Sequence, residues 1–292
     1  MEYLSRKKHI LLLMILPALL LYLVYVVMPV FASFYYSMTN SKMLGSVDFI
    51  GLHNYIFMFT KDEALLTALK NTFIVVVVVM VLMLPSSMLM AVLLNRSFKG
   101  KDLVMVLNFM PVVISPIIVG ILWVYILDPK TGLLNTFLHA VGLDFLALEW
   151  IGGTKLSIYT IAFVNNWQGM GLMMLIILSG LKMISDEIYQ SATVDGVNRW
   201  QKLVYITIPM VKQQLLIAVI LIVSGSFKIF ETILMLTKGG PNHSSESLAT
   251  YMYTKTFTAF QYGYGSSISV VIFLLTMLTS IFFIYVTNRK ES

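Results

Sequence analysis

Residues 190–209 read QSATVDGVNRWQKLVYITIP, and this stretch decides how the rest of the chain is interpreted. It is polar and helix-forming, and it lies between two long apolar runs. After Gly196, nine residues lead to Ile206, and Pro209 closes the stretch. A polar connection between two membrane helices needs no function beyond staying in water. The spacing of the glycine, isoleucine and proline nevertheless favours a more specific role.

The composition indicates a membrane protein. Of the 292 residues, 58% are hydrophobic and 12% are charged, whereas soluble domains have roughly 45–50% apolar and about 25% charged residues. A chain with so few charges cannot cover a water-facing surface. Cysteine is absent, which excludes disulfides, thiol catalysis and cysteine-ligated metals, and the four histidines fall in four different segments. The sequence therefore predicts no metal site and no cofactor.

Six apolar runs divide the chain, and each holds roughly 20 or more residues, enough to cross about 30 Å of hydrocarbon as a helix. The first run is longer than the apolar core of a signal peptide, which has about 7–15 residues, so we expect a retained span. Six spans place both termini on one side of the membrane. We predict one all-α membrane domain over residues 1–292, with spans at about 10–36, 71–94, 103–127, 156–181, 210–236 and 266–286.

The basic residues predict the orientation of these spans. The side that carries both termini, the 95–101 turn and the 182–212 region holds twelve lysines and arginines, and the opposite loops hold seven. Because basic residues are in excess in cytoplasmic loops, we expect both termini and the 182–209 loop to be cytoplasmic. The excess of basic residues in cytoplasmic loops also explains the net charge of +6. This charge therefore does not indicate a nucleic-acid partner. All four arginines belong to the first group: Arg6, Arg96, Arg199 and Arg289.

The opening stretch resembles the EAA loop of ATP-binding-cassette (ABC) import permeases. The family pattern is Glu-Ala-Ala, three residues, Gly, nine residues, then Ile-x-Leu-Pro, and the departures here are Gln190, Ser191 and Ile208. In the family this loop is a cytoplasmic coupling helix that docks into a groove on a separate ATPase subunit. We expect the small residues Ser191 and Ala192 on its exposed contact face. The resemblance implies that contact with the ATPase involves Gln190, Ser191, Ala192, Asp195, Gly196 and Pro209.

Three further motifs resemble sugar permeases of the maltose and glycerol-phosphate type. They are Gly51-Leu52-x-Asn54-Tyr55, Gly132-Leu133-Leu134-Asn135 and Thr237-x-Gly239-Gly240-Pro241, in family order. The resemblance implies the type I ABC importer permease fold and a place in the bacterial cytoplasmic membrane, in contact with membrane lipid. It also implies a second homologous permease, two cytoplasmic ATPase subunits and an external substrate-binding protein as partners. The implied solute is a carbohydrate, with an oligosaccharide favoured.

The sequence contains no pattern that indicates a catalytic site. No phosphate-binding loop of the pattern G-x-x-x-x-G-K-[ST] occurs. No grouping of serine, histidine and carboxylate suggests a hydrolytic site. We therefore predict that the chain has no catalytic residues, that it is not an enzyme, and that ATP is hydrolysed on a separate subunit.

Two charges inside the fifth run are candidates for the translocation path. Lys228 and Glu231 each cost roughly 2.5–3.5 kcal/mol at the centre of a membrane helix. Three positions apart, they are expected to share one helix face and to be able to pair. They either line the path or form a structural ion pair, and the sequence leaves both readings open.

A polar cluster in the fourth run is the second candidate for the path. Its amides and indole suit sugar hydroxyls and C–H surfaces. Hydrogen bonding between helices, which membrane helices use widely, is the slightly favoured alternative. The cluster consists of Asn165, Asn166, Trp167 and Gln168.

Two other functions remain open from the sequence. The same machinery could carry glycerol phosphate or another non-sugar solute, which basic residues along the path would favour, but only Lys228 is available. A stand-alone ion-coupled carrier belongs to a different class, often marked by inverted repeats and intramembrane carboxylates. This chain shows no visible repeat and one clear intramembrane acid, Glu231, so the importer subunit is preferred.

Overall fold

The structure is a computed structural model that describes residues 8–288 of the chain, and the side chains of residues 13–287. The named elements in this range are all helices, which confirms the predicted helical class, and one isolated bridge pairs Thr39 with Phe49. The chain divides into two compact units. Residues up to Asp62 with Met252–Val271 form the first, and Glu63–Tyr251 with residues from Ile272 onward form the second.

The first unit contains a long apolar helix and a loop anchored by Asn54. α2 (Lys8–Tyr22) passes through the π-helical η1 (Leu23–Val27) into α3 (Met28–Ser37). Asn54 lies in α4 (His53–Thr60), and its buried Nδ2 donates to the carbonyl oxygens of Ser37 and Thr39, both at 2.9 Å. The unit also includes η4 (Thr254–Thr258) and the start of α16 (Tyr262–Asn288).

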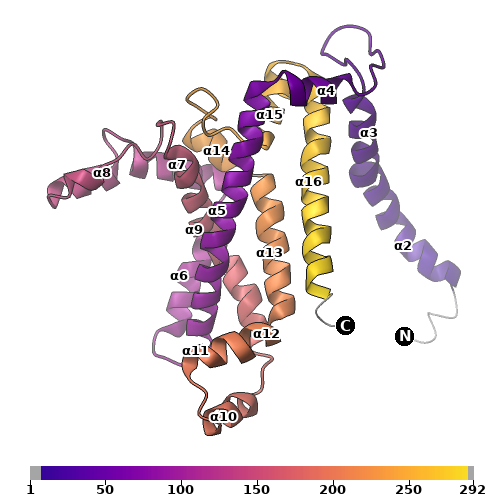
Figure 1. The fold of residues 1–292 in the computed structure, drawn as a ribbon. Helices are drawn as coiled ribbons and strands as arrows, with labels where there is room; N and C mark the ends of the chain where they lie inside the picture. Colours follow the sequence, from indigo (N-terminus) through magenta and orange to yellow (C-terminus); the bar gives the residue numbers. More distant parts are fainter. Residues whose placement is uncertain (1–7, 289–292) are drawn as a thin grey trace. The chain divides into compact units, whose positions relative to one another are not determined.

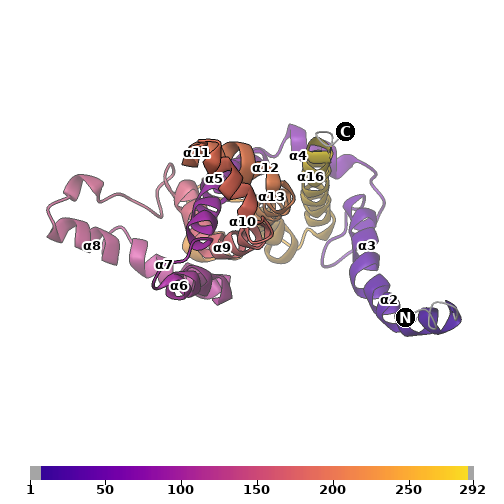
Figure 2. The same ribbon diagram turned by 90° about the horizontal axis from the view of Figure 1, so that it is seen from below.

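The second unit is built around α5 (Glu63–Leu94) and α9 (Ser157–Leu181), which pack along one another (Figure 1, Figure 2). Val75, Val79 and Ile161 are fully buried in its core. α6 (Lys101–Val113) and α13 (Lys212–Phe227) flank the central pair. The remaining elements are α7 (Pro116–Leu127), α8 (Leu133–Ala140), η2 (Asp144–Leu146), α10 (Asp186–Val194), α11 (Arg199–Gln201), η3 (Lys202–Thr207), α12 (Ile208–Met210), α14 (Glu231–Leu236) and α15 (Leu248–Tyr253).

In the described part of the chain, four helices are long and apolar enough to cross a membrane, by length and composition. Up to six spans result if each of two bent helix pairs counts as one. α5 begins at Glu63, ahead of the predicted start at residue 71. The Ala, Leu and Lys residues that follow Glu63 are strong helix formers, and an acidic residue suits the first turn of a helix. An apolar run alone does not reveal such a polar beginning.

The third predicted run is broken, because α6 and α7 are bent by 103°. Pro116 lies in the first turn of α7 and disfavours a helical conformation at Ser115, whose ψ is 134°. The break frees the carbonyl of Ile114, which accepts a hydrogen bond from Nε2 of the buried Gln168 at 3.0 Å. Gln168 thereby satisfies a polar group that an apolar environment would leave unpaired.

The fifth predicted run, 210–236, is also divided. The pair Arg199–Met210 and Lys212–Phe227 is bent by 76°. A short non-helical stretch then begins at Lys228 and ends before Glu231, where α14 starts. The expectation that these two charges share one helix face is therefore wrong. Hydropathy does not reveal the break, because the residues on both sides of it are apolar.

Gly171 sets the distance between α6 and α9. A Cβ atom at this position would lie 2.2 Å from the carbonyl oxygen of Asn108 and 2.9 Å from the Cα of Phe109. Side-chain carbons do not approach other atoms that closely, so the two backbones pack directly against each other. Small residues at membrane-helix interfaces commonly serve this purpose.

Gly171→Ala is expected to lower the stability of the folded chain by roughly 1–3 kcal/mol, because overpacking forces the backbones apart. Gly225→Ala in α13 is the matched control, since nothing lies within 4 Å of its Cβ position. Alanine in a helix interior is about 0.5–1 kcal/mol more favourable than glycine. Thermal unfolding in detergent should show a lower midpoint for Gly171→Ala only. Equal midpoints would contradict direct backbone packing.

Candidate functional site

The predicted coupling stretch contains a capped helix end at Gly196. α10 ends there because Gly196 adopts a left-handed conformation, with φ +75°. The N–H of Val197 donates to the carbonyl of Ala192 at 3.0 Å, and the N–H of Gly196 donates to the carbonyl of Thr193 at 3.1 Å. This pair of bonds is the Schellman arrangement, which requires a residue that tolerates positive φ. The glycine of the family pattern therefore terminates α10.

A second short helix begins immediately after this cap. Asn198 accepts a hydrogen bond from the N–H of Gln201, and the Gln201 side chain accepts one from the N–H of Asn198, both at 2.9 Å. This capping box starts α11, which continues through η3 into α12. The hydroxyl of Tyr189 on α10 hydrogen bonds to the hydroxyl of Thr207 on η3 at 3.1 Å. The segment from residue 186 to residue 210 is thus held together by its own contacts.

The 186–210 segment lies beyond the ends of α5, α9 and α13 (Figure 1), and it exposes large apolar side chains. Val194 is 89% exposed, Tyr205 74% and Trp200 71%. Exposed apolar side chains on one short segment make that segment a candidate interaction site. Sequence reasoning missed these three residues, although their position within a polar stretch was an available signal.

Ala192 does not lie on the exposed face of this segment. It is 6% exposed, so its predicted place on the contact face is wrong. Tyr189, one helical turn earlier, faces η3 through Thr207, and residues three apart share a helix face. Ala192 therefore lies on the inner side of α10, where a small side chain fits. The exposed members of the predicted set are Gln190, Ser191, Asp195, Gly196 and Pro209.

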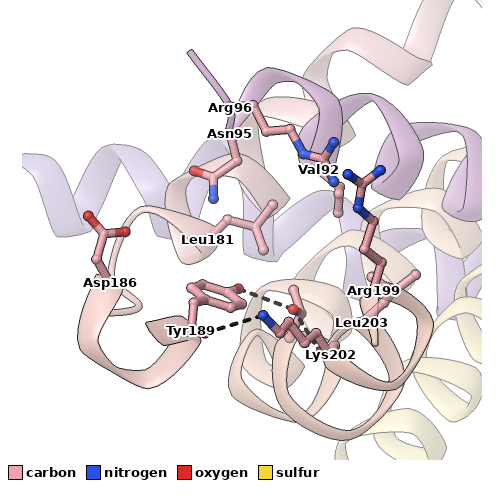
Figure 3. Close-up of a pocket in the computed structure, with 10 residues that line it drawn as sticks. Val92, Asn95, Arg96, Leu181, Asp186, Tyr189, Arg199, Lys202 and Leu203 are labelled. Atoms are coloured by element: carbon pink, nitrogen blue, oxygen red, sulfur yellow. Dashed lines mark hydrogen bonds between the residues drawn. The ribbon is translucent and has the colours of Figure 1, made fainter. Parts of the chain in front are cut away.

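A cavity of about 300 Å³ opens between the turn after α5 and the 186–210 segment (Figure 3). Tyr189 and Thr207 form part of its wall. Arg96, Arg199 and Lys202 also line it, so three cationic side chains share one hollow. The sequence did not reveal this cavity, because its two sides come from distant parts of the chain.

Three of the four path candidates of the fourth run take part in packing. Gln168 satisfies the carbonyl at the break between α6 and α7. Oδ1 of Asn166 accepts a hydrogen bond from the Ser86 hydroxyl on α5 at 3.4 Å. Trp167 meets Trp123 of α7 edge-on, with 5.5 Å between ring centroids. These contacts agree with the slightly favoured reading of hydrogen bonding and packing between helices.

For the other path candidates, no side-chain hydrogen bond or ring contact is found among the described residues. Asn165 is half-buried on α9, whereas Lys228 and Glu231 are exposed at the break between α13 and α14. Among the described residues, no ion pair joins Lys228 to Glu231, and no hydrogen bond joins either of them to the α9 cluster. α14 packs against both α7 and α9, which places the break beside the α9 helix.

Buried asparagines hold two loops of the second unit, one of them in a quoted motif. Nδ2 of Asn71 donates to the carbonyls of His243, Ser244 and Glu246, at 3.0 Å, 3.1 Å and 3.1 Å. Nδ2 of Asn135, the last residue of the 132–135 motif, donates to the carbonyls of Pro129 and Leu148, at 3.1 Å and 3.0 Å, and its Oδ1 accepts a hydrogen bond from Trp150. The motif asparagine therefore has a structural role.

Known proteins match this chain over most of its length. The family described as "Binding-protein-dependent transport system inner membrane component" matches residues 83–290. "Probable ABC transporter permease protein YurN" of Bacillus subtilis (strain 168) is 32% identical over 280 residues, covering 95% of each chain. "Multiple sugar-binding transport system permease protein MsmF" of Streptococcus mutans is 28% identical over 277 residues, covering 94% of this chain and 93% of MsmF. These matches confirm the resemblance drawn from the motifs.

A solved structure shares the fold. It is a chain of a bacterial alginate ABC transporter in complex with an alginate pentasaccharide-bound periplasmic protein. The TM-score is 0.85 at 22% sequence identity, and the likeness covers 99% of this chain and 96% of that chain. The chain therefore has the same fold as that transporter chain.

Gly196→Val is expected to open the cap between α10 and α11, because a side chain in the left-handed region costs roughly 1–2 kcal/mol. Nothing lies within 4 Å of its Cβ position, so the effect reports backbone conformation and not a clash. Gly196→Asn is the matched control, since asparagine tolerates that region. Hydrogen exchange of the Gly196-position and Val197 amides should accelerate roughly 5–30-fold in the valine variant. Equal exchange in both variants would exclude the capping role.

Proposed function

Because this chain belongs to the family of binding-protein-dependent transport system inner membrane components, we propose that it is a permease subunit of an ATP-driven importer for a carbohydrate. The observation that carries this proposal is the 186–210 segment. It is a preformed helical projection at the family spacing, and it exposes the apolar side chains of Val194, Trp200 and Tyr205. Such a surface fits docking by another protein, and the absence of a phosphate-binding loop in the sequence makes an ATPase the expected partner.

The proposed topology is one permease domain with six spans, in a bacterial cytoplasmic membrane. Four long helices and two bent pairs support this count. The arginine distribution supports cytoplasmic termini and a cytoplasmic 182–209 loop. Arg96 and Arg199 lie at the end of the second unit that carries α10, and Arg6 and Arg289 lie outside the described residues. Figure 1 shows α8 and α14 at the opposite end of the long helices, which the topology makes external.

The proposed mechanism is alternating access driven by partner subunits. A second, homologous permease pairs with this chain around a central path, two ATPase subunits dock below, and a binding protein delivers the sugar from outside. ATP binding closes the ATPase pair and moves the 186–210 segment with it. The Schellman cap, the capping box and the contact between Tyr189 and Thr207 let this segment transmit the movement to α13 as one piece. The spans then reorient from inward-facing to outward-facing.

A sugar is the proposed solute because MsmF, a relative over nearly the whole chain, is named for a multiple sugar-binding transport system. Asn165, Lys228 and Glu231 are proposed to line the path. Charges that face hydrocarbon are costly, and both Lys228 and Glu231 are exposed within this chain, so they need an aqueous path or a companion subunit beside them. Asn166, Trp167 and Gln168 are proposed to position α9 for this path rather than to bind the solute.

Val194→Glu is expected to release the ATPase subunits, because docking would bury an unpaired carboxylate. Co-purification and stimulated ATP turnover should fall at least about tenfold, while the permease stays in the membrane. Ser97→Glu in the turn after α5 adds the same charge at the same end of the bundle and is the control. Normal turnover and sugar uptake in the Val194→Glu variant would mean that the 186–210 segment is not the docking element.

The double variant Lys228→Met/Glu231→Leu tests the path residues. If both side chains line the path, uptake should fall more than about tenfold while assembly and ATP turnover persist, as expected when contacts with the solute are lost. Lys130→Met, which removes an exposed lysine from the loop after α7, is the control. A fully active double variant would remove both residues from the proposed path.

A further inference from the structure

The cavity between the turn after α5 and the 186–210 segment concentrates positive charge. Arg96 comes from the turn after α5, whereas Arg199 and Lys202 come from α11 and η3. Figure 3 shows the side chains of Arg96 and Arg199 extending toward the same part of the hollow, and the carboxylate of Asp186 lying apart from them. Like charges that converge repel one another, and an anion bound between them offsets this repulsion.

None of these cations has an acidic partner in the described part of the chain. No ion pair or side-chain hydrogen bond involves Arg96 or Arg199 there. Asp186 lines the same cavity but pairs with neither of them. The cavity is therefore lined by two guanidinium groups that have no acidic partner among the described residues.

Lys202 is fixed in place by neutral groups only. Its Nζ donates to the carbonyl of Tyr189 at 3.3 Å and to the hydroxyl of Thr193. An ammonium group has three donors, so one remains for a ligand in the cavity. Tyr189 is itself held by Thr207, which anchors this wall of the cavity. The position of the ammonium charge is thus preset before any ligand arrives.

We propose that this cavity binds a phosphate-type anion. Arginine forks match the oxygen geometry of phosphate, and a phosphate offers several strong acceptor oxygens to three cations at once. A hollow of about 300 Å³ has room for a phosphate with an attached glycerol or similar group. The anion bridges the turn after α5 and the 186–210 segment, and it thereby stabilises the position of that segment relative to the long helices.

Two kinds of ligand carry a phosphate group that fits the cavity: an anionic phospholipid, through its headgroup, and a soluble phosphate ester. Apolar Val92 and Leu181 line the cavity near the ends of α5 and α9, both long and apolar enough to span a membrane. Under the proposed topology these ends meet the cytoplasmic headgroup layer, where basic pockets between helices bind lipid headgroups. This step rests on the proposed function, whereas the anion site itself does not.

The test is a binding titration on the full-length chain, purified in neutral detergent, with the thermal unfolding midpoint as readout. The probes are phosphatidylglycerol, phosphatidylcholine, glycerol phosphate and inorganic phosphate. The Arg96→Gln/Arg199→Gln variant removes two cavity cations. The control variant Lys99→Gln/Lys101→Gln also removes two positive charges, both from the 95–101 turn. Neither lysine lines the cavity. Native mass spectrometry counts retained lipid, and neither readout requires transport or ATP turnover.

We expect the anionic probes to raise the midpoint of the wild type and the lysine variant, because a ligand that binds the folded state stabilises it. The arginine variant should bind at least about tenfold more weakly, given the contribution of each basic residue to headgroup binding. A response to phosphatidylglycerol alone assigns the site to lipid, and an equal response to glycerol phosphate assigns it to a soluble ester.

Three results would overturn the proposal. An equal response to phosphatidylcholine would show general lipid stabilisation. Equal losses in the arginine and lysine variants would show a diffuse charge effect without a site. A wild-type chain whose unfolding midpoint responds to none of the anionic probes would show that the cavity binds no phosphate-type anion. Uptake measured in parallel keeps failure of the transport proposal separate from each of these results.

Discussion

A helix that breaks in an apolar environment releases carbonyl groups that need another donor, and this constraint shapes the second unit. Gln168 supplies the donor at the sharp turn between α6 and α7. Asn71 supplies donors to three carbonyls of the loop after α14, and Asn135 to two carbonyls of the loop that includes α8. Asn71 and Asn135 each bond to more than one carbonyl, so these two side chains help to determine the shape of long connections.

The sequence predicted continuous helices well and broken ones poorly. The fourth run was predicted at residues 156–181, and α9 spans Ser157–Leu181, because an apolar run without proline leaves little choice of boundary. Pro116 lies within the third run, but the angle between α6 and α7 depends on the non-helical residues before it and on a donor from a distant helix. The break at Lys228 lies between two apolar segments, and the charges of Lys228 and Glu231 were interpreted as path or ion-pair residues and not as the end of a helix.

In the 186–210 segment, too, the sequence indicated the features that depend on neighbouring residues and missed those that depend on distant contacts. The spacing of Gly196 and Pro209 is local, and the glycine takes the positive φ that a helix end requires. The burial of Ala192 depends on how α10 lies against η3, which follows from the contact between Tyr189 and Thr207 and not from polarity along the chain. The basic cavity requires residues from two distant segments, and only the fold brings them together.

The direct contact of Gly171 with the backbone of α6 limits how this molecule can deform. Interfaces between side chains can slide by changing rotamers, but two backbones in contact have no rotamer to change. α6 and α9 are therefore expected to behave as one rigid body during any shear or hinge motion. Large displacements must then be absorbed elsewhere, and the break between α13 and α14 is a place where the chain is not held in one continuous helix. The rigid contact at Gly171 therefore favours bending at the break between α13 and α14.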